Sequence, residues 1–476
     1  MVDTTVPGVS AEIVLPNVAR PLGSAGRIAI VGKFERGTGN NPYYFSNPRD
    51  ASNVLGTSTA YSGSNIINYV FKQDQLNNNY GATSIICVRA GTTATASLVL
   101  VDGTAANVLH LAAASGGTWA NGASTGLKVS VAAGTLSGKR LTVKLNSVVV
   151  EDYDNCSNTD LYNKINAYSE YLVVTATSAE LARTLATVTD VALAGGTETS
   201  SPSTSDLSTA LATLLREDFD ILLFTDAPDP TYLPTVETWL NSKLALDKPS
   251  WAMMALDPVV AATDTVSEVL AVVAAADTML IEYINQTFVC GTDTLTAAES
   301  AARYAGFVAG MPEEESCTNK IINDITGLNK IFSDADIYNL TYGGVTVFTL
   351  KNRENSSYGV VSAVTSSLAV DDTGRKTPAS EQHAKRTLLY VLNQLNLETW
   401  LGQTGISATV ESVDGELSNR ISQIVDSNVV DSSDDIVAVP TMDTTDSDVM
   451  NIDVSVRAKG ILKHIHNRIQ LATGGS

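Results

Sequence analysis

Short, uninterrupted runs of apolar residues recur near the start of the chain. Residues 28–32 and 82–89 are predicted to be buried strands, because a continuous apolar run of this length is typical of a strand covered on both faces. Between them, residues 46–51 carry a helix-start signal, and residues 64–70 continue a helical pattern. The order strand, helix, strand predicts an α/β unit with a parallel pair of strands.

The same alternation of predicted strands and helices occurs in the second half of the chain. Apolar runs predict further buried strands, and amphipathic stretches between them predict helices. The strands are expected at 219–224, 251–256, 278–283 and 345–350, and the helices at 207–215, 233–244, from Val266 onward and at 294–310. Repeated βαβ units indicate that this half completes the sheet begun by the first.

A segment of different composition separates the two halves. Residues 91–198 are rich in Thr, Ala, Ser, Gly and Val, and residues 127–131 and 141–145 alternate between apolar and polar positions. Alternation with a period of two is typical of strands with one buried face. One helix is expected at 160–168, and the Ser/Thr-rich residues 199–205 are a linker by composition.

Both ends of the chain carry isolated strand patterns. Residues 1–20 contain one strand-like run between Pro7 and Pro16, and a strand without a hairpin partner must find a sheet edge elsewhere, on this or another subunit. Residues 376–403 predict an amphipathic helix. The tail alternates from Asn451 and is then apolar-periodic to Ile469.

The sequence therefore predicts a multidomain α/β and α+β protein. An α/β core sheet carries an inserted strand-rich domain and is followed by a C-terminal α+β domain, with extended arms at both termini. The expected boundaries are 1–20 for the N-terminal arm, 21–90 and 206–350 for the core, 91–198 for the insertion, 199–205 for the linker, and 351–476 for the C-terminal domain with its arm.

Charge narrows the choice of partners. The chain has 30 Lys and Arg against 51 Asp and Glu, a formal net charge of −21. Nucleic acid is not expected as a direct partner, because phosphate binding needs a basic surface. No membrane span is expected either, because the most apolar stretch, 266–284, is interrupted by acidic residues. Without a signal-peptide pattern, and with four scattered cysteines that we expect to be buried thiols, assembly in a cytoplasm is predicted.

The sequence offers no convincing catalytic, cofactor or metal set. The Gly-rich loop at 32–39 follows a predicted strand, but it lacks both the Walker A ending and the dinucleotide-binding spacing. The four histidines have no neighbouring cysteine to complete a zinc site. The acidic clusters at 313–315 and 431–435 lack the spacing of a calcium loop, and we interpret them as solvated loops.

Basic residues gather in two places near the C-terminus. Residues 411–450 hold ten acidic residues and one basic residue, whereas residues 451–470 hold four basic residues and one acidic residue. A second basic group lies near the start of the predicted helix at 376–403. Such groups are either solvated helix faces or surfaces that dock against acidic neighbours.

Several stretches in order resemble the contractile tail sheath family of phages and related injection systems. Near the start these are Pro7-Gly8-Val9, residues 28–32, Arg36-Gly37, Asn41-Pro42 and Asp50-Ala51. In the insertion they are residues 117–122, 149–151, 165–166 and 193–196, and later 305–310, 323–327, 344–350, 385–388 and 454–469. The Glu-rich residues 313–315 depart from the family pattern, which often has a proline- or serine-rich turn there.

The resemblance implies a structural subunit of a six-fold helical sheath that surrounds a tail tube and contracts to drive it through a target envelope. It implies partners in copies of the same chain, the tail tube protein, and baseplate and terminator proteins, with no cofactor, in the tail of a virion assembled in a host cytoplasm. The arms would add strands to neighbouring subunits through Val9, Ala11, Ile13, Leu15, Ile452, Val454 and Val456. The C-terminal domain would face the tube with Lys385, Arg386, Arg457, Lys459, Lys463 and Arg468, and the insertion would point outward.

Two other classes of protein stay open at this point. A self-assembling surface-layer or adhesin protein would explain the acidic charge and the Thr/Ser-rich strands. An α/β enzyme would explain the βαβ rhythm and the Gly-rich loop, but it would need a set of converging catalytic residues.

Overall fold

The computed structural model describes residues 26–74, 79, 81–122, 125–226, 232–246, 248–255, 265–313, 315–352, 357–395, 409–442 and 450–459. Within these ranges the chain divides into two compact units, residues 26–390 and residues 391–459. The predicted N-terminal arm and the end of the chain after residue 459 lie outside the described residues.

An eight-stranded sheet forms the centre of the first unit. Its strand order is β2-β3-β1-β13-β14-β15-β19-β20, in which the six inner strands run parallel and the two outer strands pair antiparallel. The strands are β1 (Arg27–Gly32), β2 (Pro42–Phe45), β3 (Ser84–Arg89), β13 (Ile221–Phe224), β14 (Trp251–Ala255), β15 (Ile281–Ile284), β19 (Val345–Asn352) and β20 (Ser357–Ser362). The predicted parallel pair is confirmed, and the two halves of the chain complete one sheet.

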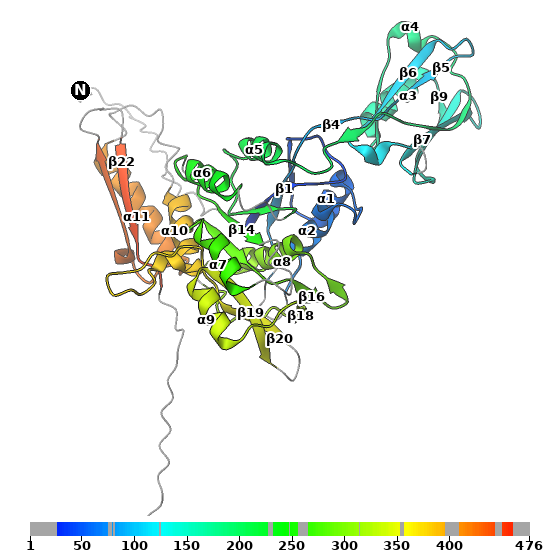
Figure 1. Ribbon diagram of the computed structural model, residues 1–476. Coiled ribbons are helices and arrows are strands. Elements are labelled where there is room, and N and C mark those ends of the chain that lie inside the picture. The colour runs from blue at the N-terminus through cyan, green and yellow to red at the C-terminus, as the bar shows by residue number, and fades with distance from the viewer. Residues whose placement is uncertain are drawn as a thin grey trace, which may run out of the picture. The chain divides into compact units, whose positions relative to one another are not determined.

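Helices cover both faces of this sheet (Figure 1). They are α1 (Pro48–Leu55), α2 (Ser62–Val70), α5 (Thr204–Thr213), α6 (Leu233–Leu244), α7 (Val266–Ala274), α8 (Ala297–Gly310), α9 (Asp334–Tyr342) and α10 (Gln382–Leu395). A small sheet of β16 (Phe288–Cys290), β17 (Asp293–Thr294) and β18 (Ile325–Leu328) lies beside them. The helix predicted from residue 376 begins instead at Gln382, because Pro378 starts a separate 3₁₀ turn at Pro378–Ser380.

Residues between β3 and α5 form two sheets with their own hydrophobic core. One sheet contains β5 (Ser97–Val101), β6 (Asn107–Ala113) and β10 (Leu172–Thr175), and the other contains β7 (Leu127–Ala133), β8 (Lys139–Leu145), β9 (Val148–Cys156) and β11 (Val188–Ala192). Helices α3 (Asn158–Tyr168) and α4 (Ser178–Leu181) accompany them, and the short pair β4 (Thr93–Ala94) and β12 (Thr197–Glu198) joins them to the rest of the chain (Figure 1). We call residues 95–196 the inserted module.

The second unit contains a helix and a two-stranded antiparallel sheet. Helix α11 (Val410–Asp426) buries Val413, Leu417 and Ile424, and it is followed by β21 (Ile436–Met442) and β22 (Met450–Val456). The side chain of Arg420 donates to the carbonyl oxygen of Gln394 at 2.7 Å, which ties α11 to the end of α10.

Helices α2 and α8 cross so closely that a glycine is needed between them. A Cβ atom on Gly306 of α8 would lie 2.5 Å from the carbonyl oxygen of Val70 and 2.8 Å from its Cα. Both are backbone atoms of α2, so neither can turn aside as a side chain could.

We therefore predict that Gly306→Ala lowers the free energy of unfolding by about 1–3 kcal/mol, because the added methyl overpacks the crossing. The matched control is Gly415→Ala in α11, where a Cβ atom would have nothing within 4 Å of it. There alanine should stabilise the protein by about 0.5–1 kcal/mol, because it costs less backbone entropy than glycine in a helix. Thermal and urea unfolding measure both, and equal effects of the same sign would contradict the packing explanation.

Candidate assembly site

Helix α10 places three polar side chains against the core sheet. Gln382, Lys385 and Arg386 are spaced three and four residues apart, so they lie on one face of the helix. Their side chains are buried, with exposed fractions of 0%, 1% and 5%. Buried charges are expensive unless they are paired, so each of these groups requires partners.

The partner of Lys385 is Glu282, which is fully buried in the middle of β15. The Glu282 carboxylate accepts from Gln382 Nε2 at 2.9 and 2.8 Å, from Thr346 Oγ1 of β19 at 3.0 Å and from Lys385 Nζ at 3.4 Å. Gln382 Nε2 also donates to the Tyr304 hydroxyl of α8 at 3.1 Å. Two strands and two helices therefore meet at one buried carboxylate.

An aromatic ring completes the surroundings of Lys385. Its Nζ lies 3.1 Å from the ring centroid of Trp251 in β14, the geometry of a cation–π contact. Burial lowers the pKa of Lys385 to about 7, and the negative charge of Glu282 opposes that shift. Burial and the nearby Glu282 raise the pKa of Tyr304 well above its usual value. We call this set of residues — Glu282, Tyr304, Thr346, Gln382, Lys385 and Trp251 — the α10 clamp.

Arg386 attaches the same helix to the loop after α8. Its guanidinium donates to the carbonyl oxygens of Met311 at 2.9 Å, Pro312 at 3.3 Å and Glu315 at 3.2 Å, and it pairs with Glu313 at 3.2 Å. Burial lowers the pKa of Arg386, but the charge and hydrogen bond of Glu313, together with Cys317 and Tyr304, raise it by more, so the pKa lies above its usual value. Our interpretation of residues 313–315 as a solvated loop is therefore wrong for Glu313, whose side chain is only 16% exposed.

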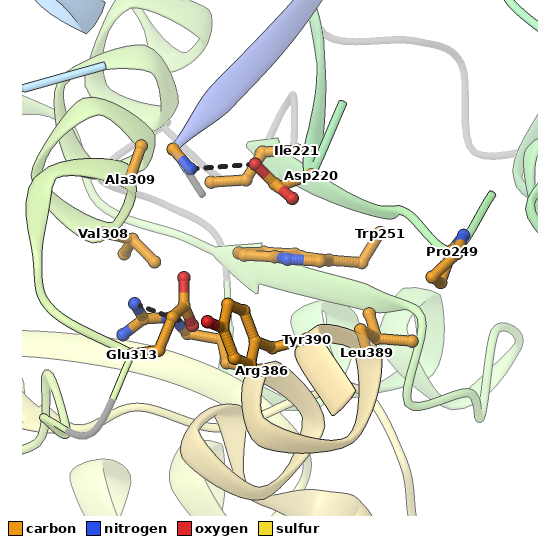
Figure 2. Close-up of a pocket in the computed structure, with 11 residues that line it drawn as sticks. Asp220, Ile221, Pro249, Trp251, Val308, Ala309, Glu313, Arg386, Leu389 and Tyr390 are labelled. Atoms are coloured by element: carbon orange, nitrogen blue, oxygen red, sulfur yellow. Dashed lines mark hydrogen bonds and ion pairs between the residues drawn. The ribbon is translucent and has the colours of Figure 1, made fainter. Parts of the chain in front are cut away.

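A small cavity lies beside these groups, next to the start of β1 and to helix α10 (Figure 2). Its volume is about 30 Å³, and Gly26, Asp220, Trp251, Glu313, Arg386 and Tyr390 are among the residues that line it. The Asp220 carboxylate accepts from the backbone N–H groups of Gly26 and Arg27, both at 2.8 Å. A cavity of this size suits about one or two water molecules, not a substrate.

An α/β enzyme of this topology would bind its ligand at one particular place on the edge of the sheet. That place is the carboxyl end of β1 and β13, where the strand order reverses. Here Thr225 packs against Gly32, its Oγ1 accepts from the N–H of Lys33 at 2.7 Å, and Phe34 of the Gly-rich loop is fully buried. The start of the loop at 32–39 therefore packs against this edge of the sheet.

The described residues also contain no group of three or more His, Cys, Asp or Glu side chains that could hold a metal ion. No described helix is long and apolar enough to cross a membrane. The four cysteines are free and buried, as predicted.

The C-terminal strand residues Ile452, Val454 and Val456 lie in β22 and pair with β21 of the same chain. The register joins Met450–Val456 to Met442–Ile436 without a break. Our prediction that these residues form a donated arm is therefore corrected: they belong to a hairpin within the subunit. Val9, Ala11, Ile13 and Leu15 lie outside the described residues.

Within the part of the chain that the structure describes, no further strand pairs with the outer edge of β22. The N–H of Arg457 donates to the carbonyl oxygen of Asp435 at 2.7 Å, which places the backbone groups of the odd-numbered β22 residues toward β21. Those of Met450, Ile452, Val454 and Val456 consequently point away from β21. On the opposite edge Pro440 has no N–H to offer, so the outward ladder of β21 is interrupted.

The predicted tube-facing basic residues are placed differently from one another. Lys385 and Arg386 are buried inside the subunit, so this part of the prediction is corrected: their charges are used to hold α10. The Arg457 side chain is 78% exposed and contacts Asp435, and the Lys459 ammonium lies 3.3 Å from Asp431. Lys463 and Arg468 lie outside the described residues.

Comparison with known proteins gives a consistent result for the fold. No protein-family model matches the sequence, and no curated protein matches it. Among solved structures, a sheath tail protein from Listeria innocua has a TM-score of 0.70 at 16% identity, covering 92% of this chain and 93% of that one. A sheath tail protein from Desulfitobacterium hafniense has a TM-score of 0.67 at 14% identity, covering 95% and 100%.

The helical sheath of the anti-feeding prophage in its contracted state is also similar, with a TM-score of 0.53 at 12% identity over 98% of this chain and 99% of that one. The chain has the fold of the contractile tail sheath proteins. The family resemblance found in the sequence is thereby confirmed at the level of the fold.

The α10 clamp makes a testable prediction about stability. Lys385→Met should lower the free energy of unfolding by about 3–5 kcal/mol, because it leaves the Glu282 charge buried without its counter-ion. The double variant Glu282→Gln/Lys385→Met should regain more than half of that loss, because neither charge remains. Urea unfolding of Glu282→Gln, of Lys385→Met and of the double variant measures the coupling between the two residues.

The matched control is Lys320→Met, which breaks a 2.6 Å ion pair with Glu315 whose partners are 35% and 45% exposed. A surface pair of this kind is worth less than about 1 kcal/mol. If the single variants at 282 and 385 were strictly additive, the two residues would not form a coupled pair and the clamp would be refuted.

Proposed function

We propose that the chain is a structural subunit of a contractile tail sheath. Copies polymerise as a six-fold helical tube around an inner tail tube, and contraction of this tube drives the inner one through a target cell envelope. The observation that carries the proposal is the similarity of nearly the whole chain to two sheath tail proteins, over 92% and 95% of its length.

The outer edge of β22, which pairs with no other described strand, supports a specific way of linking subunits. An extended segment of one subunit adds to this edge in a neighbour, because four outward backbone positions from Met450 to Val456 present N–H and C=O groups that have no partner among the described residues. Residues 1–20, with Val9, Ala11, Ile13 and Leu15, supply such a strand. The outer edge of β21 has one backbone N–H fewer, so an added strand would form more hydrogen bonds with β22 than with β21.

Contraction needs no chemical step in this proposal. Main-chain hydrogen bonds between subunits persist while the rigid cores change their orientation, as in other rigid-body transitions. The α10 clamp supports this role, because it fixes the start of the helix from which the chain continues to the strand-bearing unit.

The remaining roles follow from the proposed assembly. The C-terminal domain, 351–476, faces the tail tube, and of the six basic residues first considered, Arg457, Lys459, Lys463 and Arg468 are the ones proposed to contact it. The inserted domain, 91–198, points outward. Baseplate and terminator proteins bind the two ends of the tube, and the assembled protein resides in the tail of a virion or related particle.

Substitution of one outward-facing residue of β22 tests the strand-addition step. Val454→Pro removes an N–H that points away from β21, so it should leave the hairpin paired while abolishing formation of ordered tubes by the purified full chain in negative-stain electron microscopy. Deletion of residues 1–20 should have the same effect from the donor side.

The matched control is Val454→Thr, which keeps the backbone N–H and should assemble like the parent chain. Hydrogen exchange provides a second measurement that needs no variant: the Val454 amide should be slow to exchange in tubes and fast in isolated subunits. Normal tubes from Val454→Pro, together with equally fast exchange in tubes and subunits, would rule out this edge.

A further inference from the structure

The inserted module and the core sheet have separate hydrophobic cores. The buried apolar residues of the first lie between Ala96 and Leu193, and those of the second come from residues 28–90 and 210–389. No described residue belongs to both cores. When two parts of a chain share no apolar core, motion of one relative to the other is the default expectation.

The backbone crosses between the two parts at one narrow place. The chain passes outward through β4 and returns through β12, and these strands pair at two positions, Thr197 with Ala94 and Glu198 with Thr93. A ribbon this short can twist at little cost, because few hydrogen bonds must change.

A buried ion pair fixes the crossing at one point. Arg89, at the end of β3, is 3% exposed; its guanidinium pairs with Glu198 and donates to the carbonyl oxygens of Gly37 at 3.1 Å and Gly116 at 2.7 Å. The other carboxylate oxygen of Glu198 accepts from the Tyr61 hydroxyl at 2.7 Å and from Thr118 Oγ1 at 2.8 Å. Groups from both parts therefore converge on this pair.

Away from the Arg89–Glu198 pair, the core part and the inserted module contact each other less tightly. The guanidinium of Arg36 in the core lies over the ring of Trp119 at 4.4 Å and near that of Tyr171 at 5.5 Å, both in the inserted module. Beside this stack lies a cleft of about 410 Å³. Asp50 and Asn53 of α1 line one wall, and Ser115 and Glu170 line the other.

We propose that the inserted module is hinged: it rotates about the Arg89–Glu198 pair and thereby opens and closes the cleft beside Arg36. The pair is buried and held by many hydrogen bonds, so it acts as the pivot. The flat guanidinium of Arg36 can slide across the two aromatic rings and keep its attraction to them in more than one position. The polar walls remain hydrated when the cleft opens.

Distance measurement between spin labels tests the hinge in the full chain. Labels at Arg49→Cys in α1 and Tyr168→Cys in α3 span the cleft without lining it, and both positions are exposed. The native cysteines are buried, and burial raises the pKa of Cys290 and Cys317 to about 12, so they should resist labelling. In the control pair, Arg49→Cys with Asn339→Cys, both labels are on the part of the chain that contains the core sheet, and neither is on the inserted module.

The proposal predicts a broad or two-peaked distance distribution across the cleft and a single narrow one for the control pair. Arg36→Ala should shift the cross-cleft distribution to longer distances, because the variant lacks the stack on Trp119 and Tyr171 that holds the two walls together. A cross-cleft distribution as narrow as the control, in the parent chain, would overturn the hinge whether or not the Arg36 variant folds.

Discussion

The attraction between Lys385 and Glu282, deep in the first unit, is the interaction on which the rest of the arrangement depends. Removing two charges from water costs several kcal/mol for each, and this cost is offset only when the charges meet in good geometry with hydrogen-bond partners around them. Gln382 and Thr346 supply those hydrogen bonds, and Trp251 adds a cation–π contact, in a single position of α10. Any other position of the helix would strand a buried charge, so the pair selects one arrangement.

This constraint matters because α10 runs from Gln382 to Leu395 and carries the chain out of the core unit. Its first half is held by the clamp and by Arg386, and its last turn contacts Arg420 of α11. The groups proposed to join copies lie further along the chain, at the edge of β22 that pairs with no other described strand. The polar groups of the α10 clamp are thus paired within the subunit, whereas the outward backbone groups of β22 have no partner among the described residues.

Much of the fold could be predicted from the sequence, because parallel strands buried on both faces give continuous apolar runs and the helices between them give periodic ones. The strands of the inserted module could be predicted equally well, because their apolar and polar residues alternate. The residues of the α10 clamp were harder to predict from the sequence. Glu282 interrupts an apolar strand, which signals a buried partner, but nothing in the local pattern identifies Lys385, about one hundred residues later, as that partner.

The basic residues show why this limit is physical. Lys385 and Arg386 look in sequence like the charged face of an amphipathic helix, and only the packing of α10 against β15 and the loop after α8 reveals that they are buried. The pairing of β22 was missed for a similar reason: an alternating strand gives no sign of whether its partner lies in the same chain or in another. Pro440, by contrast, was a signal available in the sequence for an interrupted edge.

The most direct test of the account is a helical reconstruction by electron cryomicroscopy of tubes assembled from the purified chain. The account predicts that each β21–β22 hairpin is extended by a strand from another subunit, hydrogen-bonded along Met450, Ile452, Val454 and Val456. Tubes in which this edge of β22 faces solvent, with subunits joined through other surfaces, would contradict it.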